Sequence, residues 1–172
     1  MRAVIQRCTK ASVLVDNEVI SSIGRGICVL VGISKDDTKK DIDFMVRKLV
    51  NIRLFEDESG KRWSHSVKDK GYEILLVSQF TLLGTLKGNK PDFRLAMQPE
   101  TSAKMYMELV SAVKRAYSEE LVKDGKFGAY MQVCVQNDGP VTIELESPLQ
   151  STPIHLGRSK EAQTPEQETE AL

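Results

Sequence analysis

Two short segments carry the residue types with which this chain could do chemistry. The first is Ser78–Leu82, Ser-Gln-Phe-Thr-Leu, which follows an apolar run and supplies two hydroxyls and an amide. Such groups at the end of a strand can hold an acylated or phosphorylated ligand. A strand end followed by a solvated basic loop accounts for the same residues, so this segment alone does not decide the function.

The loop that follows, residues 83–95, concentrates positive charge around one aromatic side chain, Phe93. Its cations are Lys87, Lys90 and Arg94. Cations beside an aromatic ring form a local binding patch for phosphate. The whole chain has 24 basic and 24 acidic side chains and a net charge of zero, so no global field attracts nucleic acid. A polyanion would therefore have to bind at this patch.

The second segment is Asn137–Thr142, which reads Asn-Asp-Gly-Pro-Val-Thr. Asn, Asp, Gly and Pro are ordinary turn residues. Proline has no donor for a sheet ladder, which suits the start of a strand. Taken alone, these residues predict a hairpin between two strands.

Other kinds of catalytic chemistry find little support in the sequence. Thr81 is a candidate nucleophile, but an alcohol needs an adjacent base, and the chain's two histidines, His65 and His155, lie in neither segment. No Cys/His spacing is typical of a zinc site. The three cysteines, Cys8, Cys28 and Cys134, are expected to be small hydrophobic residues of the core. We expect no metal and no cofactor.

Strands and helices that would position the two segments are visible in the hydrophobic pattern. Apolar residues at offsets 0, 3, 4, 7 and 8 from Ile42 predict a helix over 38–51, and a similar stripe predicts a helix over Glu100–Tyr117. Runs rich in Val and Ile between turn residues predict strands. These are Arg2–Thr9, Ala11–Val15, Glu18–Ile23, Gly26–Ile33, Ile52–Phe55, Tyr72–Val77, Tyr130–Val135 and Val141–Glu146.

The composition changes near Ser147. From there on Ser, Thr, Pro, Gln and Glu dominate, so residues 148–172 are expected to be a disordered, polar and acidic tail. Residues 1–147 are expected to form one α+β domain. We expect no signal peptide, and the apolar runs of the sequence are too short to span a bilayer. We expect the chain in the cytoplasm, and in the nucleus as well if it is small enough to diffuse there.

Several motifs in order resemble the D-aminoacyl-tRNA deacylase family, and most closely its eukaryotic branch. The resemblance covers about residues 1–147 and leaves the tail outside. The matching segments are Met1–Arg7, Asn51–Lys61, Ser78–Leu82, Lys87–Phe93, Lys126–Met131 and Asn137–Thr142.

This resemblance implies a β-barrel-like mixed sheet with two main helices and a homodimer with active sites at the subunit interface. It implies hydrolysis of D-aminoacyl-tRNA, and of glycyl-tRNA mischarged on tRNA(Ala), with rejection of L-aminoacyl-tRNA. The residues that would form the catalytic site are Ser78, Gln79, Phe80 and Thr81. The residues that would bind substrate are Gly139 and Pro140, as a cis pair inserted into the partner's pocket, with Arg7, Phe127 and Met131 in support.

We expect catalysis without a side-chain nucleophile: backbone N–H groups around Gln79–Thr81 would stabilise the oxyanion, and the ribose 2′-hydroxyl of the substrate would help to position water. The alternative function is DNA binding associated with replication. Longer relatives are associated with that role through basic C-terminal extensions, whereas the tail here is net acidic.

Overall fold

The computed structural model describes residues 1–148 of the chain. In chain order its elements are β1 (Arg2–Val15), β2 (Glu18–Ile23), β3 (Gly26–Gly32), α1 (Lys39–Asn51), α2 (Val67–Lys70), β4 (Glu73–Ser78), the 3-10 helix η1 (Phe80–Leu83), β5 (Thr85–Lys87), β6 (Lys90–Asp92), α3 (Pro99–Ala116), β7 (Val122–Asp124) and β8 (Gln132–Glu146). No helix in this part of the chain is long and apolar enough to cross a membrane.

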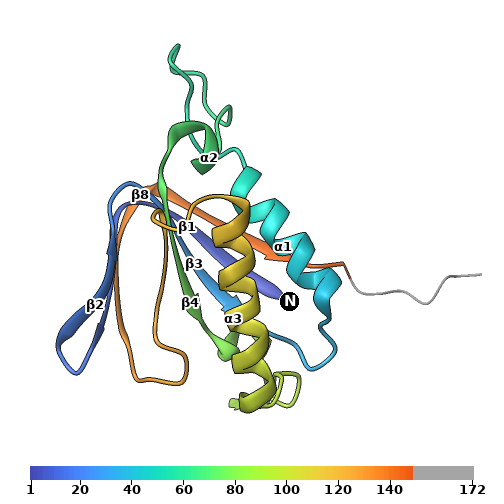
Figure 1. Ribbon diagram of the computed structural model, residues 1–172. Helices are drawn as coiled ribbons and strands as arrows, with labels where there is room; N and C mark the ends of the chain where they lie inside the picture. Colours follow the sequence, from blue (N-terminus) through green and yellow to red (C-terminus); the bar gives the residue numbers. More distant parts are fainter. Residues whose placement is uncertain (149–172) are drawn as a thin grey trace, which may run out of the picture.

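A mixed six-stranded sheet forms the body of the molecule and curves into a nearly closed barrel. Its order is β2-β1-β3-β4-β7, and β8 pairs with β1. β1 is antiparallel to β2, β3 and β8, whereas the β3–β4 and β4–β7 pairs are parallel. The helices α1 and α3 pack together over the sheet (Figure 1). The predicted α+β fold with two main helices is confirmed.

Both long helices begin and end close to the predicted residues. Thr38 is the N-cap of α1 and forms a capping box with Asp41, which satisfies N–H groups that the first turn would leave without acceptors. Pro99 begins α3, a position at which its missing N–H costs nothing. Each helix buries one apolar stripe against the sheet, as the spacing predicted. The buried apolar residues are Ile42, Met45, Leu49 and Val50 in α1 and Tyr106, Leu109, Val110 and Val113 in α3.

Two of the three cysteines belong to the core, as expected. Burial raises the pKa of the Cys8 thiol to about 11 and that of the Cys28 thiol to about 12, so both remain protonated at neutral pH. Cys134 differs, because β8 lies at the border of the sheet and leaves this side chain exposed on the single chain. The expectation of a buried position was wrong for Cys134.

The predicted hairpin at Asn137–Pro140 is also wrong. The chain does not reverse there: a single strand, β8, runs through these residues and pairs with β1 on both sides of them. Gln6 pairs with Thr142 and Cys8 with Asn137, so β8 uses three more residues than β1 between these pairs. The surplus forms a bulge. Turn residues produced a bulge because both flanking segments pair with the same strand.

Other predicted boundaries changed as well. The two expected strands within residues 2–15 are one strand, β1, because β8 pairs along nearly its whole length. Residues 52–55 do not form a strand, and Phe55 makes only an isolated bridge with His65. No sequence pattern indicated α2, β7 or the paired strands β5 and β6, each of which has at most four residues.

The end of β8 is tied to the start of the chain. The Ser147 hydroxyl donates to Asp41 Oδ1 at 2.6 Å, and its backbone N–H donates to the Met1 carbonyl at 2.9 Å. Ser147 is therefore an integral part of the packed domain. The domain limit after residue 147 remains a prediction, and the expected tail lies outside the described residues apart from Pro148.

The parallel contact between β3 and β4 generates a prediction about stability. A Cβ atom on Gly26 would lie 1.8 Å from the backbone carbonyl oxygen of Glu73, which cannot rotate away. We expect Gly26→Ala to lower the free energy of unfolding by more than about 2 kcal/mol. Gly24→Ala is the matched control, since its Cβ would meet only the end of the flexible Glu73 side chain at 3.3 Å. Urea titration of both variants measures the difference, and equal stabilities would contradict this packing.

Candidate active site

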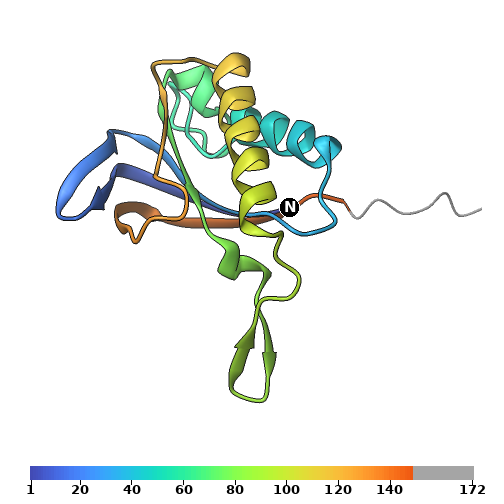
Figure 2. The same cartoon turned by 60° about the horizontal axis from the view of Figure 1, so that its bottom comes forward.

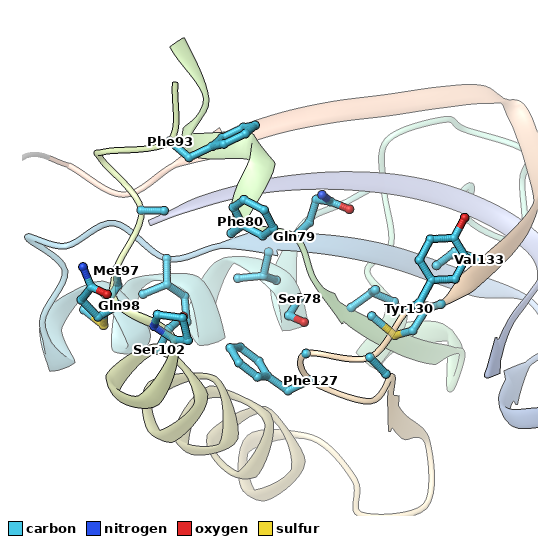
Figure 3. Close-up of a pocket in the computed structure, with 18 residues that line it drawn as sticks. Ser78, Gln79, Phe80, Phe93, Met97, Gln98, Ser102, Phe127, Tyr130 and Val133 are labelled. Carbon is cyan, nitrogen blue, oxygen red and sulfur yellow. The ribbon is translucent and has the colours of Figure 1, made fainter. Parts of the chain in front are cut away.

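A pocket of about 850 Å³ opens between the end of β4, the start of α3 and the segment that leads into β8 (Figure 3). Its walls are largely apolar. The lining residues are Val31, Ile33, Val77, Ser78, Gln79, Phe80, Phe93, Ala96, Met97, Gln98, Pro99, Ser102, Phe127, Gly128, Ala129, Tyr130, Met131 and Val133. The pocket thus contains three of the four predicted catalytic residues, and Thr81 lies just outside its lining.

The backbone at the mouth of this pocket leaves two donors without acceptors. Gln79 follows the last residue of β4, and its N–H donates to the Val31 carbonyl at 2.7 Å. η1 then begins at Phe80, and the first N–H groups of a helix have no partner within the helix. Among residues 1–148, the N–H groups of Phe80 and Thr81 donate to no other backbone or side-chain group. They are therefore available to a negatively charged oxygen of a ligand.

Thr81 has no neighbouring base that would make it a nucleophile. Its hydroxyl oxygen accepts a hydrogen bond from the side-chain amide of Gln79, which is a donor and cannot remove a proton. Within the described residues, no imidazole or carboxylate contacts the Thr81 hydroxyl. His65 lies in the loop before α2 and is paired with Phe55 and Glu58 instead.

Aromatic rings form two sides of the pocket. The Phe80 and Phe93 rings meet edge to face at 5.1 Å, and Phe80 is 56% exposed, so the rim is accessible. On the other side Phe127 packs against Tyr106 of the core, with ring centroids 5.7 Å apart. Tyr130, at the mouth, is 91% exposed.

Several lining residues were not expected from the sequence. Ser102 is one of them, and its position on the buried face of α3 was the available signal, since a polar residue interrupts an otherwise apolar stripe. Met97, Gln98 and Tyr130 offered no such signal. They line the pocket because of the path of the loops before α3 and before β8.

The predicted phosphate-binding residues lie on a projecting hairpin, β5–β6, and on the segment that follows it (Figure 2). Asp92 pairs with Arg94 at 2.7 Å and with Lys87 at 3.2 Å. Hydrogen bonds from Arg94 hold the pKa of Asp92 well below its usual range, so this carboxylate stays charged. Lys90 has no carboxylate within 4.0 Å in the described part of the chain. The patch remains positive but is partly neutralised.

Arg7 contacts the bulge of β8. Its Nε donates to the Asp138 carbonyl at 3.1 Å and its Nη1 donates to the Leu54 carbonyl at 2.6 Å. The next peptide bond, between Gly139 and Pro140, is cis, and both residues are exposed. Gly139 is needed here because its φ is 131° and an added Cβ would lie 3.2 Å from Arg7 Nη2.

Gly139 and Pro140 do not line the pocket of their own chain. The register of the sheet places Ser78 beside Val31, and Val31 beside Ala3 of β1. The bulge instead lies beside Cys8 of β1. Five residues of an extended strand separate Ala3 from Cys8, which corresponds to about 16 Å. Phe127 and Met131 lie at the pocket, with Ser78 and Phe80. One chain therefore holds the two halves of the predicted site apart.

Comparison with known proteins identifies first the class of this protein, enzymes that hydrolyse aminoacyl-tRNA, and then its family. The sequence profile of the D-Tyr-tRNA(Tyr) deacylase family matches residues 4–146. The chain is 59% identical over 175 residues to D-aminoacyl-tRNA deacylase 1 of Bos taurus, a match that spans 99% of this chain and 84% of that protein. The chain belongs to the D-Tyr-tRNA(Tyr) deacylase family, as its motifs predicted.

Two solved structures share the fold of this chain. The structure of a c-Myc DNA Unwinding Element Binding Protein is 64% identical in sequence and superimposes with a TM-score of 0.84, covering 87% of this chain and all of that one. A probable eukaryotic D-amino acid tRNA deacylase, 20% identical, superimposes with a TM-score of 0.73 over 84% of this chain and 97% of that one. At that identity the second comparison shows the fold alone.

Proposed function

We propose that the protein hydrolyses the ester bond between a D-amino acid and the terminal ribose of tRNA, releasing free tRNA and the amino acid. The observation that carries this proposal is the pair of free backbone N–H groups, on Phe80 and Thr81, at the mouth of a pocket large enough for an aminoacylated nucleoside. An ester of this kind already hydrolyses in water, so moderate stabilisation of its transition state is sufficient.

In this mechanism the backbone performs the main electrostatic task. As water attacks the ester carbonyl, negative charge develops on its oxygen, and the N–H groups of Phe80 and Thr81 stabilise that charge. The N–H of Gln79 takes no part, because it is already committed to Val31 in the sheet. The ribose 2′-hydroxyl of the substrate helps to position the attacking water. Gln79 orients Thr81 through its amide.

The second half of the site comes from another copy of the chain in this proposal. Gly139 and Pro140 are exposed and lie about five residues along β1 from their own pocket. β8, which carries them, pairs with β1 alone among the described strands, so its other edge is open for an intermolecular contact. A homodimer would place the bulge of each subunit in the pocket of its partner.

This arrangement explains how the enzyme would reject L-amino acids. A backbone segment held near the substrate Cα leaves no room for an L side chain, whereas a D side chain points away from it. Backbone suits this task better than a side chain, because a side chain can change its rotamer. Glycine has no side chain to exclude, so the same filter would admit glycyl-tRNA, including glycine mischarged on tRNA(Ala).

A first prediction from this proposal tests the function directly. The purified protein should deacylate D-tyrosyl-tRNA and glycyl-tRNA and should spare L-tyrosyl-tRNA. Release of the amino acid is measured for all three substrates, with the spontaneous hydrolysis of each ester as the control. Hydrolysis of the L form as fast as the D form would refute the chiral filter. Hydrolysis of the D form without that of glycyl-tRNA would refute exclusion as its mechanism.

A second prediction concerns the catalytic role of Thr81. If the backbone stabilises the oxyanion, Thr81→Ala should retain most of the deacylase activity, with Thr81→Ser as the matched variant that keeps the hydroxyl. Single-turnover hydrolysis of D-tyrosyl-tRNA measures the effect. A loss of more than about 10³-fold in a variant that still folds and binds tRNA would show instead that Thr81 is a nucleophile.

The hairpin next to the pocket is proposed to bind the phosphates of the tRNA. Lys87 and Arg94 share Asp92, whereas Lys90 has no carboxylate partner in the described part of the chain. Phe93 joins the hairpin to the pocket through its contact with Phe80. A tRNA whose acceptor end enters the pocket would pass this hairpin. We expect the protein to act in the cytoplasm, where aminoacyl-tRNA is used.

DNA binding is a second candidate function, favoured by the name of the relative whose structure is 64% identical, a c-Myc DNA Unwinding Element Binding Protein. The chain has no net charge to attract duplex DNA, and the predicted tail is acidic. Within the described structure, the cations on and beside the β5–β6 hairpin would also bind the phosphates of DNA. DNA and tRNA would then compete for one patch.

A third prediction separates these candidates. Lys90→Ala should weaken tRNA binding and reduce the slope of log K against log salt concentration by about one. Lys48→Ala, which removes an exposed charge from the last turn of α1, should leave the slope unchanged. The same titrations with duplex DNA should show weak binding. Tight, salt-dependent binding of DNA that is lost on deletion of residues 149–172 would favour the DNA-binding function.

A further inference from the structure

Arg7 is one of the side chains that hold the bulge of β8, together with Arg25, which lies 3.6 Å from the Asp138 carboxylate, and Gln6, which accepts a hydrogen bond from Asn137. Its guanidinium donates to the carbonyls of Asp138 and Leu54, and it lies 3.5 Å from the Asp138 carboxylate. The side chain of Arg7 is only 20% exposed, so it is confined by these contacts. Because Arg7 contacts the backbone carbonyl of Asp138, the position of its guanidinium influences the position of the neighbouring Gly139.

The ring of Trp63 lies beside this guanidinium. The centroid of the ring is 5.9 Å from Arg7 Cζ, which is a cation–π distance. Trp63 is the only tryptophan of the chain, and 54% of it is exposed. A residue that leaves over half of a large ring in water gains little from burial. The specific interaction that its ring makes is the cation–π contact with Arg7.

The backbone of Trp63 is also unusual. Its φ is 59°, in the left-handed region that bulky residues avoid. The other non-glycine residues with positive φ, Asp16 and Asn17, form the β1–β2 turn, where their types are favoured. Holding a tryptophan in this region is unfavourable, so the surrounding loop must enforce it.

The loop before α2 is built to do this. Phe55 and His65 close its base with backbone hydrogen bonds of 2.9–3.0 Å, and the Asp57 carboxylate accepts from the N–H groups of Ser59 and Lys61. Figure 1 shows this loop projecting beyond α2. The base of the loop adjoins Leu54, whose carbonyl Arg7 also contacts. A fixed loop thus presents Trp63 to Arg7.

We propose that Trp63 is a positioning residue for chiral selection: its ring holds the Arg7 guanidinium against the bulge and thereby sets the position of Gly139 and Pro140. This inference rests on the proposed function, in which those two residues form the filter. Trp63 acts through Arg7 and not by contact with the reacting atoms. Its loss allows the bulge to move, and an L side chain that a fixed backbone would exclude then gains entry.

The test is the ratio of kcat/KM for D-tyrosyl-tRNA to that for L-tyrosyl-tRNA. In Trp63→Ala this ratio should fall by about tenfold, the change expected for loss of one partly exposed cation–π contact. Trp63→Phe retains an aromatic ring and should recover most of the ratio. Met107→Ala, which truncates a similarly exposed apolar side chain on α3, should leave it unchanged. A general loss of folded protein lowers both rates equally and cannot change the ratio.

Two further variants separate failure of this inference from failure of the proposed function. Pro140→Ala alters the filter itself. If it changes the ratio and Trp63→Ala does not, the role of Trp63 is refuted and the filter stands. If neither variant changes the ratio, the filter is refuted as well.

The double variant Arg7→Lys with Trp63→Ala tests the route through Arg7. It should lower the D/L ratio by less than the product of the two single reductions, because both substitutions break the same contact. Multiplicative effects would refute the route through Arg7.

Tryptophan fluorescence checks the contact without any substrate. Because the chain has one tryptophan, its emission reports on Trp63 alone. Arg7→Lys should shift that emission, since it removes the planar cation beside the ring. Emission that is identical in the two proteins would show that the ring and the guanidinium do not interact in solution, and would overturn the proposal.

Discussion

The antiparallel pairing of β8 with β1 is the constraint on which the rest of the structure depends. β1 and β8 have 14 and 15 residues, and they pair over almost their full lengths. The pairing continues on both sides of the bulge, so Gly139 and Pro140 are carried along the strand and presented at its surface. β1 simultaneously pairs with β3, and β3 with β4, which places Ser78 level with Ala3 near the start of β1, whereas the bulge lies beside Cys8 in the middle of that strand. One strand thus sets the distance between the two parts of the site.

This separation accounts for the unusual surface of a single chain. It leaves an open, largely apolar pocket in one place and an exposed backbone bulge in another. In the function proposed above, backbone atoms perform both demanding tasks: N–H groups on η1 stabilise charge, and the bulge excludes the wrong enantiomer. Side chains such as Arg7, Gln79 and Trp63 then serve mainly to hold that backbone in place.

Local patterns in the sequence predicted the helices well, because a helix depends on neighbours within a few residues. Thr38 and Asp41 cap α1, and the stripe from Ile42 to Val50 faces the core. Most of the longer strands were located as well, but residues 52–55 form none, β5, β6 and β7 were missed, and the pairing partners of the strands were not predicted. Cys134 was expected in the core because it lies in an apolar strand. That strand, β8, lies at the border of the sheet and pairs with one other strand of the chain, so the side chain is exposed. The cations around Phe93 were identified, whereas their pairing with Asp92 required the β5–β6 hairpin.

The order and spacing of the Ser78–Leu82 and Asn137–Thr142 motifs were sufficient by themselves to indicate the family and its chemistry. Tertiary structure alone decided where those residues lie. The turn residues at 137–140 became a bulge, since the segments beside them both pair with β1, and the N–H of Gln79 was removed from the candidate oxyanion site by Val31. Both outcomes depend on which distant strand supplies a hydrogen-bond partner. Residue types and spacings along one segment do not contain that information.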